Sequence, residues 1–176
     1  MTPEDISSLR RLIVDVPDWP TPGVVFKDIT PLLASADALR QVVDAVTEPY
    51  LGVGIDKVAG IEARGFLFAG PVAYHLDAGL VPVRKPDKLP RAVLTRSYDL
   101  EYGSNTLAVH ADAFAPGDKV LIVDDVLATG GTAAAAVDLV QQAGATVIGI
   151  AVLMELSFLA GRAALPDVPV SSLLTI

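Results

Sequence analysis

The chain of 176 residues contains no cysteine and only 2 histidines. Without cysteine it can form no disulfide, and it has neither a thiolate nucleophile nor a zinc–thiolate site. The histidines, His75 and His110, are too few and too far apart in the sequence to indicate a metal site. Thiol catalysis and histidine-based metal centres are therefore excluded as classes of site.

Long hydrophobic runs are also missing, although 52% of the residues are hydrophobic and the mean hydropathy is +0.50. Charges, prolines and glycines interrupt every apolar stretch before it reaches the ~18 residues typical of a membrane-spanning helix. The apolar excess is instead expected in buried parallel strands. Residues 1–5 show no basic region followed by an apolar core, as a secretory signal would. We therefore expect a cytoplasmic protein.

Positive charge is scarce as well. The chain has 13 Lys and Arg side chains against 21 Asp and Glu, which gives a net charge of −8 and a pI near 4.6. This balance argues against nucleic acid and membranes as partners. An anionic substrate would therefore need a local basic cluster.

The length is that of one domain, 1–176, and apolar strand patterns alternate with helical ones. This predicts an α/β fold with a central, mostly parallel sheet flanked by helices. The expected strands are 57–61, 80–83, 106–109, 120–123 and 147–154, and the expected helices are 4–13, 36–51, 65–76 and 132–143. Prolines exclude a helix or an interior strand from 17–23, within an N-terminal arm, 1–35. The segment 84–104 is charged and lacks a steady period, so we expect a functional or mobile loop.

The most informative run is VLIVDDVLATGGT at 120–132. Four aliphatic residues predict a buried strand, Asp124 and Asp125 follow it, and the alanine-rich segment after the run predicts a helix. Open α/β sheets bind ligands at such strand-to-helix crossovers. The small residues of the turn let several backbone N–H groups converge on one anion: Ala128, Thr129, Gly130, Gly131 and Thr132. A phosphate fits there, and two carboxylates suit a sugar diol or a divalent cation, so the ligand implied is a phosphorylated sugar.

Other glycine motifs do not match this run. A Walker-type loop needs a lysine before the final threonine, where Gly131 stands, and no G-x-G-x-x-G fingerprint is completed. The alternative is a tight turn in an ordinary strand–helix unit with two solvated acids. The run resembles the signature of the type I phosphoribosyltransferases, which bind 5-phosphoribosyl 1-pyrophosphate through two acids and a phosphate loop.

A second turn, GIEARG at 60–65, has the same arrangement of strand, small residues and helix start. Arg64 at a helix N-terminus is locally unfavourable by about 0.3–1 kcal/mol, which suggests an anion between the arginine and the backbone amides. An arginine paired with Glu62 is the alternative. The resemblance implies that Glu62, Ala63 and Arg64 receive the pyrophosphate, across a cis peptide bond.

The segment 84–104 contributes a basic cluster, Arg84, Lys85 and Lys88, followed by SYDLEYG at 97–103. Solvated charges on a surface loop are the alternative for the cluster. The second motif resembles the mobile catalytic loop of the adenine phosphoribosyltransferases. The resemblance implies that Glu101 takes the N9 proton of the base and that Tyr102 closes over the sugar; an ordinary loop carboxylate remains the alternative for Glu101.

A base pocket is suggested by PGVVFKDITP at 22–31, another hallmark of that family. Backbone groups of Val25 and Lys27 could accept from N6 and donate to N1 of adenine, while Phe26 could lie against the ring. Lys27 stands where the family often has arginine, which puts discrimination against 6-oxopurines in question. The segments 154–156 and 159–162 also match the family, with Leu156 as a second apolar wall or simply a core residue.

The resemblance implies transfer of the phosphoribosyl group to adenine, giving AMP and pyrophosphate. It also implies a mobile catalytic loop, a small hood formed by the N-terminal arm, a homodimer, and Mg²⁺ held mainly through the pyrophosphate and the ribose hydroxyls rather than by direct protein ligands. Two alternatives remain: a 6-oxopurine phosphoribosyltransferase, and a regulator that senses phosphoribosyl pyrophosphate. The regulator is disfavoured because the acidic chain has no room for a separate nucleic-acid-binding module.

Overall fold

The computed structural model describes residues 1–99 and 104–176. The chain forms two compact units, Met1–Ala45 and Val46–Ile176, and each is described by itself. The expected single domain remains a prediction. No helix within the described residues is long and apolar enough to cross a membrane.

The second unit is built on a five-stranded sheet in the order β4-β3-β7-β8-β9, in which every neighbouring pair is parallel. Its strands are β3 (Lys57–Ile61), β4 (Gly79–Val83), β7 (Lys119–Leu127), β8 (Thr146–Glu155) and β9 (Val170–Thr175). Most of the apolar residues of β3, β7 and β8 are almost fully buried, because helices cover both faces of a parallel sheet. The predicted α/β fold with a parallel sheet is confirmed.

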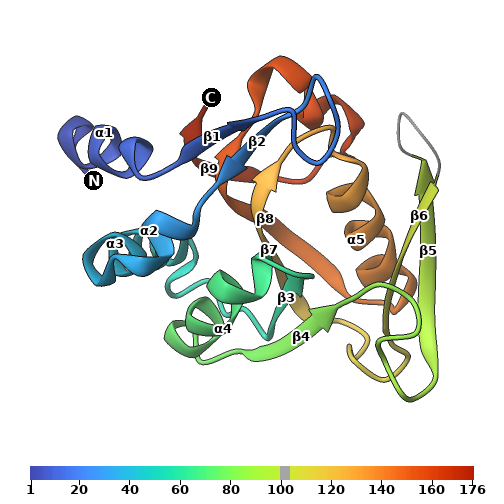
Figure 1. Cartoon of the computed structure of the whole chain (residues 1–176). Helices are drawn as coiled ribbons and strands as arrows, with labels where there is room; N and C mark the ends of the chain where they lie inside the picture. The colour runs from blue at the N-terminus through green and yellow to red at the C-terminus, as the bar shows by residue number, and fades with distance from the viewer. Residues whose placement is uncertain (100–103) are drawn as a thin grey trace. The chain divides into compact units, whose positions relative to one another are not determined.

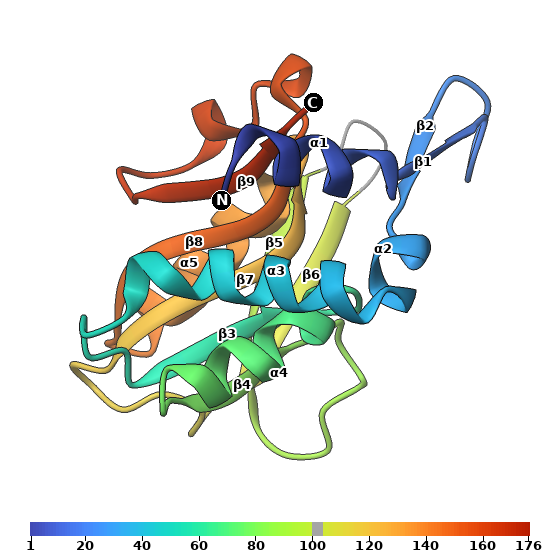
Figure 2. The same cartoon turned by 90° about the vertical axis from the view of Figure 1, so that its left-hand side faces the viewer.

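Two helices cover opposite faces of this sheet: α4 (Gly65–His75) and α5 (Gly131–Gln142) (Figures 1 and 2). The chain passes from β3 through α4 to β4 on one side, and from β7 through α5 to β8 on the other. The order therefore reverses between β3 and β7, and open α/β sheets bind ligands at the carboxyl ends of the strands at such a point. The turns after β3 and β7 meet at this edge.

A two-stranded antiparallel sheet, β5 (Val93–Asp99) and β6 (Ser104–His110), lies beside α5 (Figure 1). The expectation that 84–104 lacks regular structure is wrong for β5. Every second residue of β5 faces the helix: Leu94 and Tyr98 pack against the core, and Arg96 Nε lies 2.8 Å from Asp138 Oδ2. This two-residue alternation is short and half polar, so it gave no clear period. Mobility of the segment remains a prediction.

The first unit contains α1 (Pro3–Arg11), β1 (Val14–Pro17), β2 (Val25–Asp28), α2 (Thr30–Ala34) and most of α3 (Ala36–Thr47). Thr2 and Asp5 form a reciprocal cap at the start of α1. The antiparallel strands β1 and β2 flank the proline-rich stretch, and Trp19 lies edge-on to Phe26 with ring centroids 4.3 Å apart. The expected helix 36–51 ends earlier, because Pro49 starts a short 3-10 turn, η1 (Glu48–Tyr50).

After β8 the chain forms two 3-10 turns, η2 (Ser157–Leu159) and η3 (Gly161–Ala164), before it enters β9. The carboxyl ends of β8 and β9 are joined where Ile176 N–H donates to Glu155 O at 2.9 Å. Leu165 and Val168, between η3 and β9, pack against the core of the unit. The segment that leads from η3 to β9 is therefore anchored on this core.

Candidate functional site

The two acids lie within β7, which continues through Leu127 instead of ending at Val123 as expected. Pairing with β3 stops at Val123, whereas pairing with β8 continues to the end of β7, so β7 projects past its neighbour. Asp124 and Asp125 occupy this projecting part. Asp125 is 4% exposed, and its N–H donates to Asp124 Oδ1 at 2.8 Å.

Arg64 connects the turn after β3 to the acids, because its Nη2 lies 2.8 Å from Asp125 Oδ2. Gly65 makes this approach possible. A Cβ on Gly65 would lie 2.8 Å from Asp124 Oδ1 and 2.9 Å from Val123 O, closer than such contacts allow. The sequence analysis assigned Glu62, Ala63 and Arg64 to the site but did not identify Gly65, whose missing side chain permits the close approach to β7. A glycine directly after an arginine at the end of a strand is the signal that could have identified it.

Glu62 is held by the predicted basic cluster. Its Oε2 accepts from Arg84 Nε and from Lys85 N–H, each at 3.1 Å, and Arg84 Nη1 donates to Lys88 O at 3.1 Å. The Glu62–Ala63 peptide bond is cis, as the resemblance implies. The structure thus brings Glu62, Ala63 and Arg64 together with the predicted basic residues, and Lys85 and Lys88 remain exposed.

The electrostatics of the acids differ from those of Glu62. Desolvation, and after it the Asp125 carboxylate, raises the pKa of Asp124 well above its usual range. Desolvation also raises the pKa of Asp125, against the opposing charge of Arg64. For Glu62 desolvation is outweighed by the Lys85 N–H and Arg84, so its pKa is lowered. Two crowded carboxylates favour a ligand that donates hydrogen bonds or carries positive charge.

The predicted phosphate loop leads into α5. Gly130 has φ +86°, a left-handed conformation that favours glycine, and α5 begins at Gly131. The first N–H groups of α5 have no earlier helical carbonyl to bind, so they can donate to an anion. Thr132 Oγ1 donates to the hydroxyl of Tyr98 on β5 at 3.0 Å. Tyr98 was missed as a site residue, although the alternation of Leu94, Arg96 and Tyr98 could have placed it on the helix-facing side.

The predicted base-binding residues lie in different parts of the structure. Val25, Phe26 and Lys27 form β2 of the first unit, where Lys27 Nζ lies 2.6 Å from Asp15 Oδ1. Leu156 follows β8 in the second unit and is 9% exposed. Glu101 and Tyr102 lie outside the described residues. The roles of these six residues remain predictions.

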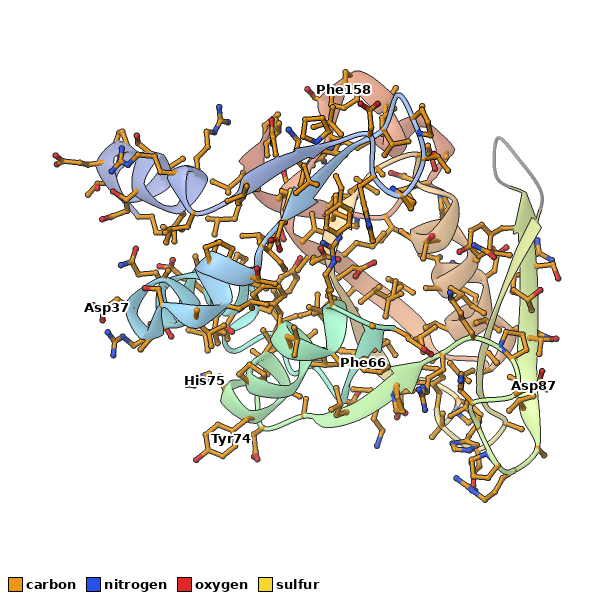
Figure 3. All side chains as sticks on the ribbon, viewed as in Figure 1. Asp37, Phe66, Tyr74, His75, Asp87 and Phe158 are labelled. Atoms are coloured by element: carbon orange, nitrogen blue, oxygen red, sulfur yellow. The ribbon has the colours of Figure 1, made fainter. Side chains whose placement is uncertain are left out.

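The histidines lie away from these turns. His75 ends α4 beside Tyr74, and both side chains point outward (Figure 3). His110 ends β6. Within 1–99 and 104–176, no three His, Asp or Glu side chains gather closely enough to hold a metal ion by themselves.

Comparison with known families matches residues 27–168 to the phosphoribosyl transferase domain. An adenine phosphoribosyltransferase of Thermobifida fusca is 61% identical over 173 residues, covering 98% of each chain. One of Acidothermus cellulolyticus is 58% identical over 177 residues, covering 100% of each.

Solved structures agree in fold. The adenine phosphoribosyltransferase of Rhodothermus marinus superposes with a TM-score of 0.96 at 51% identity, covering 99% of this chain and 100% of the other. The enzyme of Saccharomyces cerevisiae, solved with adenine and an imino-altritol bisphosphate, has a TM-score of 0.91 at 38% identity and covers 98% and 100%.

Proposed function

The chain belongs to the adenine phosphoribosyltransferase family. We propose that it joins N9 of adenine to C1 of 5-phosphoribosyl 1-pyrophosphate, giving AMP and pyrophosphate, and that the residues described above have the following roles. One observation supports the assignment of roles above all others. Arg64, in the turn after β3, forms an ion pair with Asp125 of β7, because the two strands are neighbours and end at the same edge of the sheet. A sugar bound at the acids would have its pyrophosphate beside Arg64.

The donor is bound in three parts. The backbone N–H groups of the loop bind its 5-phosphate, and the loop consists of Ala128, Thr129, Gly130, Gly131 and Thr132. Asp124 and Asp125 accept hydrogen bonds from the 2- and 3-hydroxyls, which satisfies two carboxylates whose pKa values desolvation raises. The pyrophosphate lies along Glu62, Ala63 and Arg64, within reach of Arg84, Lys85 and Lys88.

The basic residues promote departure of the pyrophosphate. Glycosyl transfer develops positive, oxocarbenium-like charge at C1 as the bond to the leaving oxygen lengthens. Arg64 and Arg84 stabilise the negative charge that accumulates on the pyrophosphate. The acids hold the ribose through its 2- and 3-hydroxyls, so that C1 can move toward the base without loss of the sugar.

Mg²⁺ fits this donor set as a partner of the substrate. The oxygens of Asp124 and Asp125 are of the type that Mg²⁺ prefers, and this ion commonly keeps several waters and binds through substrate phosphates. When bound, it would neutralise part of the charge on the pyrophosphate. Contacts to the pyrophosphate and the ribose hydroxyls would hold it, with no direct protein ligand required.

For the acceptor base, backbone groups of Val25 and Lys27 in β2 read the N6 and N1 edge of adenine, and Phe26 lies against its ring. Leu156, directly after β8, is a separate candidate for an apolar contact with the base. Glu101 takes the N9 proton and Tyr102 closes over the sugar. A 6-oxopurine reverses the pattern of donor and acceptor at this edge and should be a poor substrate.

Release of pyrophosphate tests the proposal. The purified protein is supplied with phosphoribosyl pyrophosphate, Mg²⁺ and, in parallel, adenine, hypoxanthine, guanine or orotate. We expect AMP from adenine and far slower turnover of the other bases. Comparable rates with adenine and hypoxanthine would contradict the specificity, and no turnover with any base would contradict the enzymatic function. We also propose a cytoplasmic homodimer without nucleic acid or membrane partners, which sedimentation and cell fractionation can test.

A further inference from the structure

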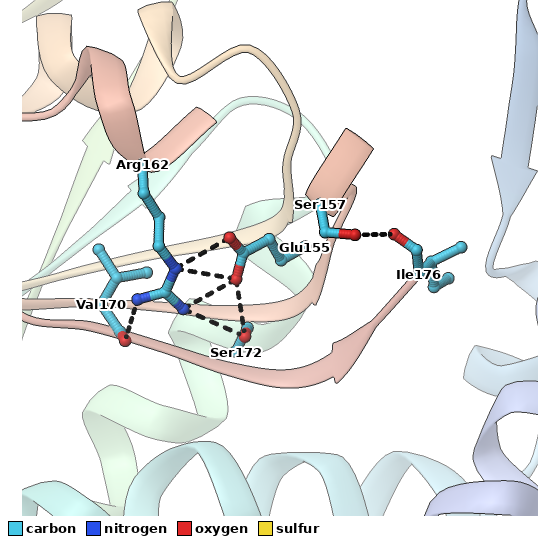
Figure 4. A network of polar contacts seen from close by, with 6 residues as sticks. All are labelled: Glu155, Ser157, Arg162, Val170, Ser172 and Ile176. Carbon is cyan, nitrogen blue, oxygen red and sulfur yellow. Dashed lines mark hydrogen bonds and ion pairs between the residues drawn. The ribbon is translucent and has the colours of Figure 1, made fainter. Parts of the chain in front are cut away.

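The segment after β8 carries a polar network that has no part in the proposed binding of substrates (Figure 4). Glu155, the last residue of β8, is 8% exposed. Its carboxylate accepts from Arg162 Nε at 2.8 and 3.0 Å and from Arg162 Nη2 at 2.8 Å. Ser172 Oγ donates to the same carboxylate at 3.1 Å, and Arg162 Nη1 donates to Val170 O at 3.0 Å. One guanidinium therefore joins the end of β8 to η3 and to β9.

The geometry of this pair is specific to arginine. A planar guanidinium can donate several N–H groups in fixed directions, whereas a lysine offers a single ammonium group. The hydrogen bonds from Arg162 are the main cause that lowers the pKa of Glu155, so the carboxylate stays ionised near neutral pH. Arg162 keeps 48% of its side chain exposed, so the pair is strong without being fully desolvated. The network therefore holds η3 in one orientation.

Gly161, directly before Arg162, touches the phosphate loop. A Cβ on Gly161 would lie 2.2 Å from Ala128 O and 3.2 Å from Gly130 N, and a Cβ on Gly130 would lie 2.2 Å from Gly161 O. The two backbones are in contact at positions where neither could carry a side chain. Any rotation of η3 would therefore press on the loop or leave it unsupported.

A second connection runs from Leu156, the residue after Glu155, to the start of the loop. Leu156 N–H donates to Leu127 O at 2.9 Å, and Leu127 directly precedes Ala128. Residues adjacent to Glu155 and to Arg162 therefore contact the loop at Ala128 and Gly130 and at Leu127, which precedes it. A shift of η3 against the loop by a few tenths of an ångström would turn the backbone N–H groups of the loop away from the phosphate. The position of η3 therefore matters for phosphate binding.

From these contacts we infer that Glu155 and Arg162 are positioning residues, which hold the loop 128–132 in the conformation that binds the 5-phosphate of the donor. This inference rests on the proposed function, because that function assigns the phosphate to the loop. It adds a requirement outside the binding residues themselves: the C-terminal turns set the geometry of the phosphate site through Gly161.

The test compares Arg162→Met, Arg162→Lys and the wild-type protein by calorimetry with ribose 5-phosphate and with adenine, together with steady-state kinetics. For Arg162→Met we expect the Kd of ribose 5-phosphate and the KM of phosphoribosyl pyrophosphate to rise about tenfold, equal to about 1.4 kcal/mol. The Kd of adenine should change less than about twofold, since the network leaves the N6 and N1 contacts in place. Arg162→Lys keeps the positive charge but loses the planar guanidinium with its several N–H donors. Its Kd for ribose 5-phosphate and its donor KM should lie between those of Arg162→Met and the wild type.

Arg40→Met is the matched control. Arg40 forms an exposed ion pair with Asp37 on α3, and neither residue lies in the phosphate loop, in η3 or in the segment 84–104. Its removal should leave both affinities unchanged. Circular dichroism and urea unfolding check that each variant is folded, and Arg162→Lys keeps the test valid if Arg162→Met does not fold.

A folded Arg162→Lys or Arg162→Met with wild-type affinity for ribose 5-phosphate would overturn the inference. So would an equal loss of affinity for ribose 5-phosphate and adenine, because that pattern indicates general loosening instead of a shift of the phosphate loop. If the wild-type protein itself forms no AMP, the proposed function fails and the inference fails with it. Formation of AMP by the wild type, with unchanged variants, would overturn the inference alone.

Discussion

The acidic pair on β7 should cost stability in the free protein, and Asp124→Asn measures that cost. Asp124 Oδ1 accepts from Asp125 N–H at 2.8 Å, and an asparagine oxygen can accept the same hydrogen bond. The substitution therefore removes a charge and little else. The ion pair of Asp125 with Arg64 is left in place.

The sign of the effect follows from the pKa of Asp124, which desolvation and the Asp125 carboxylate raise in the folded protein. Between the unfolded and the folded pKa, the folded state binds more protons, so the wild type loses stability as the pH rises through this window. Above the folded pKa, Asp124 is fully ionised in the folded protein, and its charge has its full destabilising effect. Asparagine has no charge to lose, so the variant should gain most relative to the wild type at high pH.

The magnitude follows from general electrostatics. Two like charges roughly 6 Å apart repel by about 3 kcal/mol at an effective dielectric constant of about 20. Partial exposure of Asp124 and the nearby Arg64 reduce this figure. We expect Asp124→Asn to raise the free energy of unfolding at pH 8 by ~1–2 kcal/mol and to raise the KM of phosphoribosyl pyrophosphate about tenfold or more, through loss of a charged acceptor.

Urea unfolding at pH 5 and pH 8, with donor kinetics at pH 8, provides the measurement. Asp112→Asn is the control, because the hydrogen bond from Arg91 lowers the pKa of the exposed Asp112 and the expected sign is opposite. A less stable Asp124→Asn variant at pH 8 would refute the electrostatic reasoning. If Asp124→Asn gains stability but the KM of phosphoribosyl pyrophosphate does not change, Asp124 does not take part in donor binding.

Three further predictions concern Gly65, Tyr98 and the carboxylate of Glu101, which is proposed to take the base proton. Gly65→Ala should lower the free energy of unfolding by ~1–3 kcal/mol and raise donor KM, since its Cβ would lie 2.9 Å from Val123 O; Gly70→Ala on the same helix, with open space around its Cβ, should be neutral or stabilising in the same urea titration. Tyr98→Phe should raise donor KM about two- to tenfold in steady-state assays, because Thr132 loses a hydrogen-bond partner. An unchanged KM would mean that this contact from β5 does not contribute to donor binding. Glu101→Gln should lower kcat by ~10²–10⁴ with little change in donor affinity by calorimetry; near-normal kcat would mean that the base proton leaves by another route.

Patterns of sequence predicted the parallel sheet because its strands are strongly apolar and its helices are long enough to show a period. The run 120–132 also indicated a phosphorylated sugar, since two acids and a small-residue loop are adjacent along the chain. The short, half-polar strands β1, β2, β5 and β9 escaped prediction, because strand formation there depends on pairing and on contact with one face of another element. The end of β7 was misplaced for the same reason: its extension through Asp124 and Asp125 is set by pairing with β8.

By itself, then, the sequence determined the local chemistry: which residues carry charge, where small residues expose the backbone, and which family the motifs resemble. Tertiary structure alone decided which of these residues meet. Arg64 pairs with Asp125 because β3 and β7 are neighbours in the sheet, and Gly161 supports Ala128 and Gly130 because η3 is tied to β8 and β9. Both contacts join residues far apart in the chain. Their partners depend on strand order and on packing without space for a side chain, which no local period records.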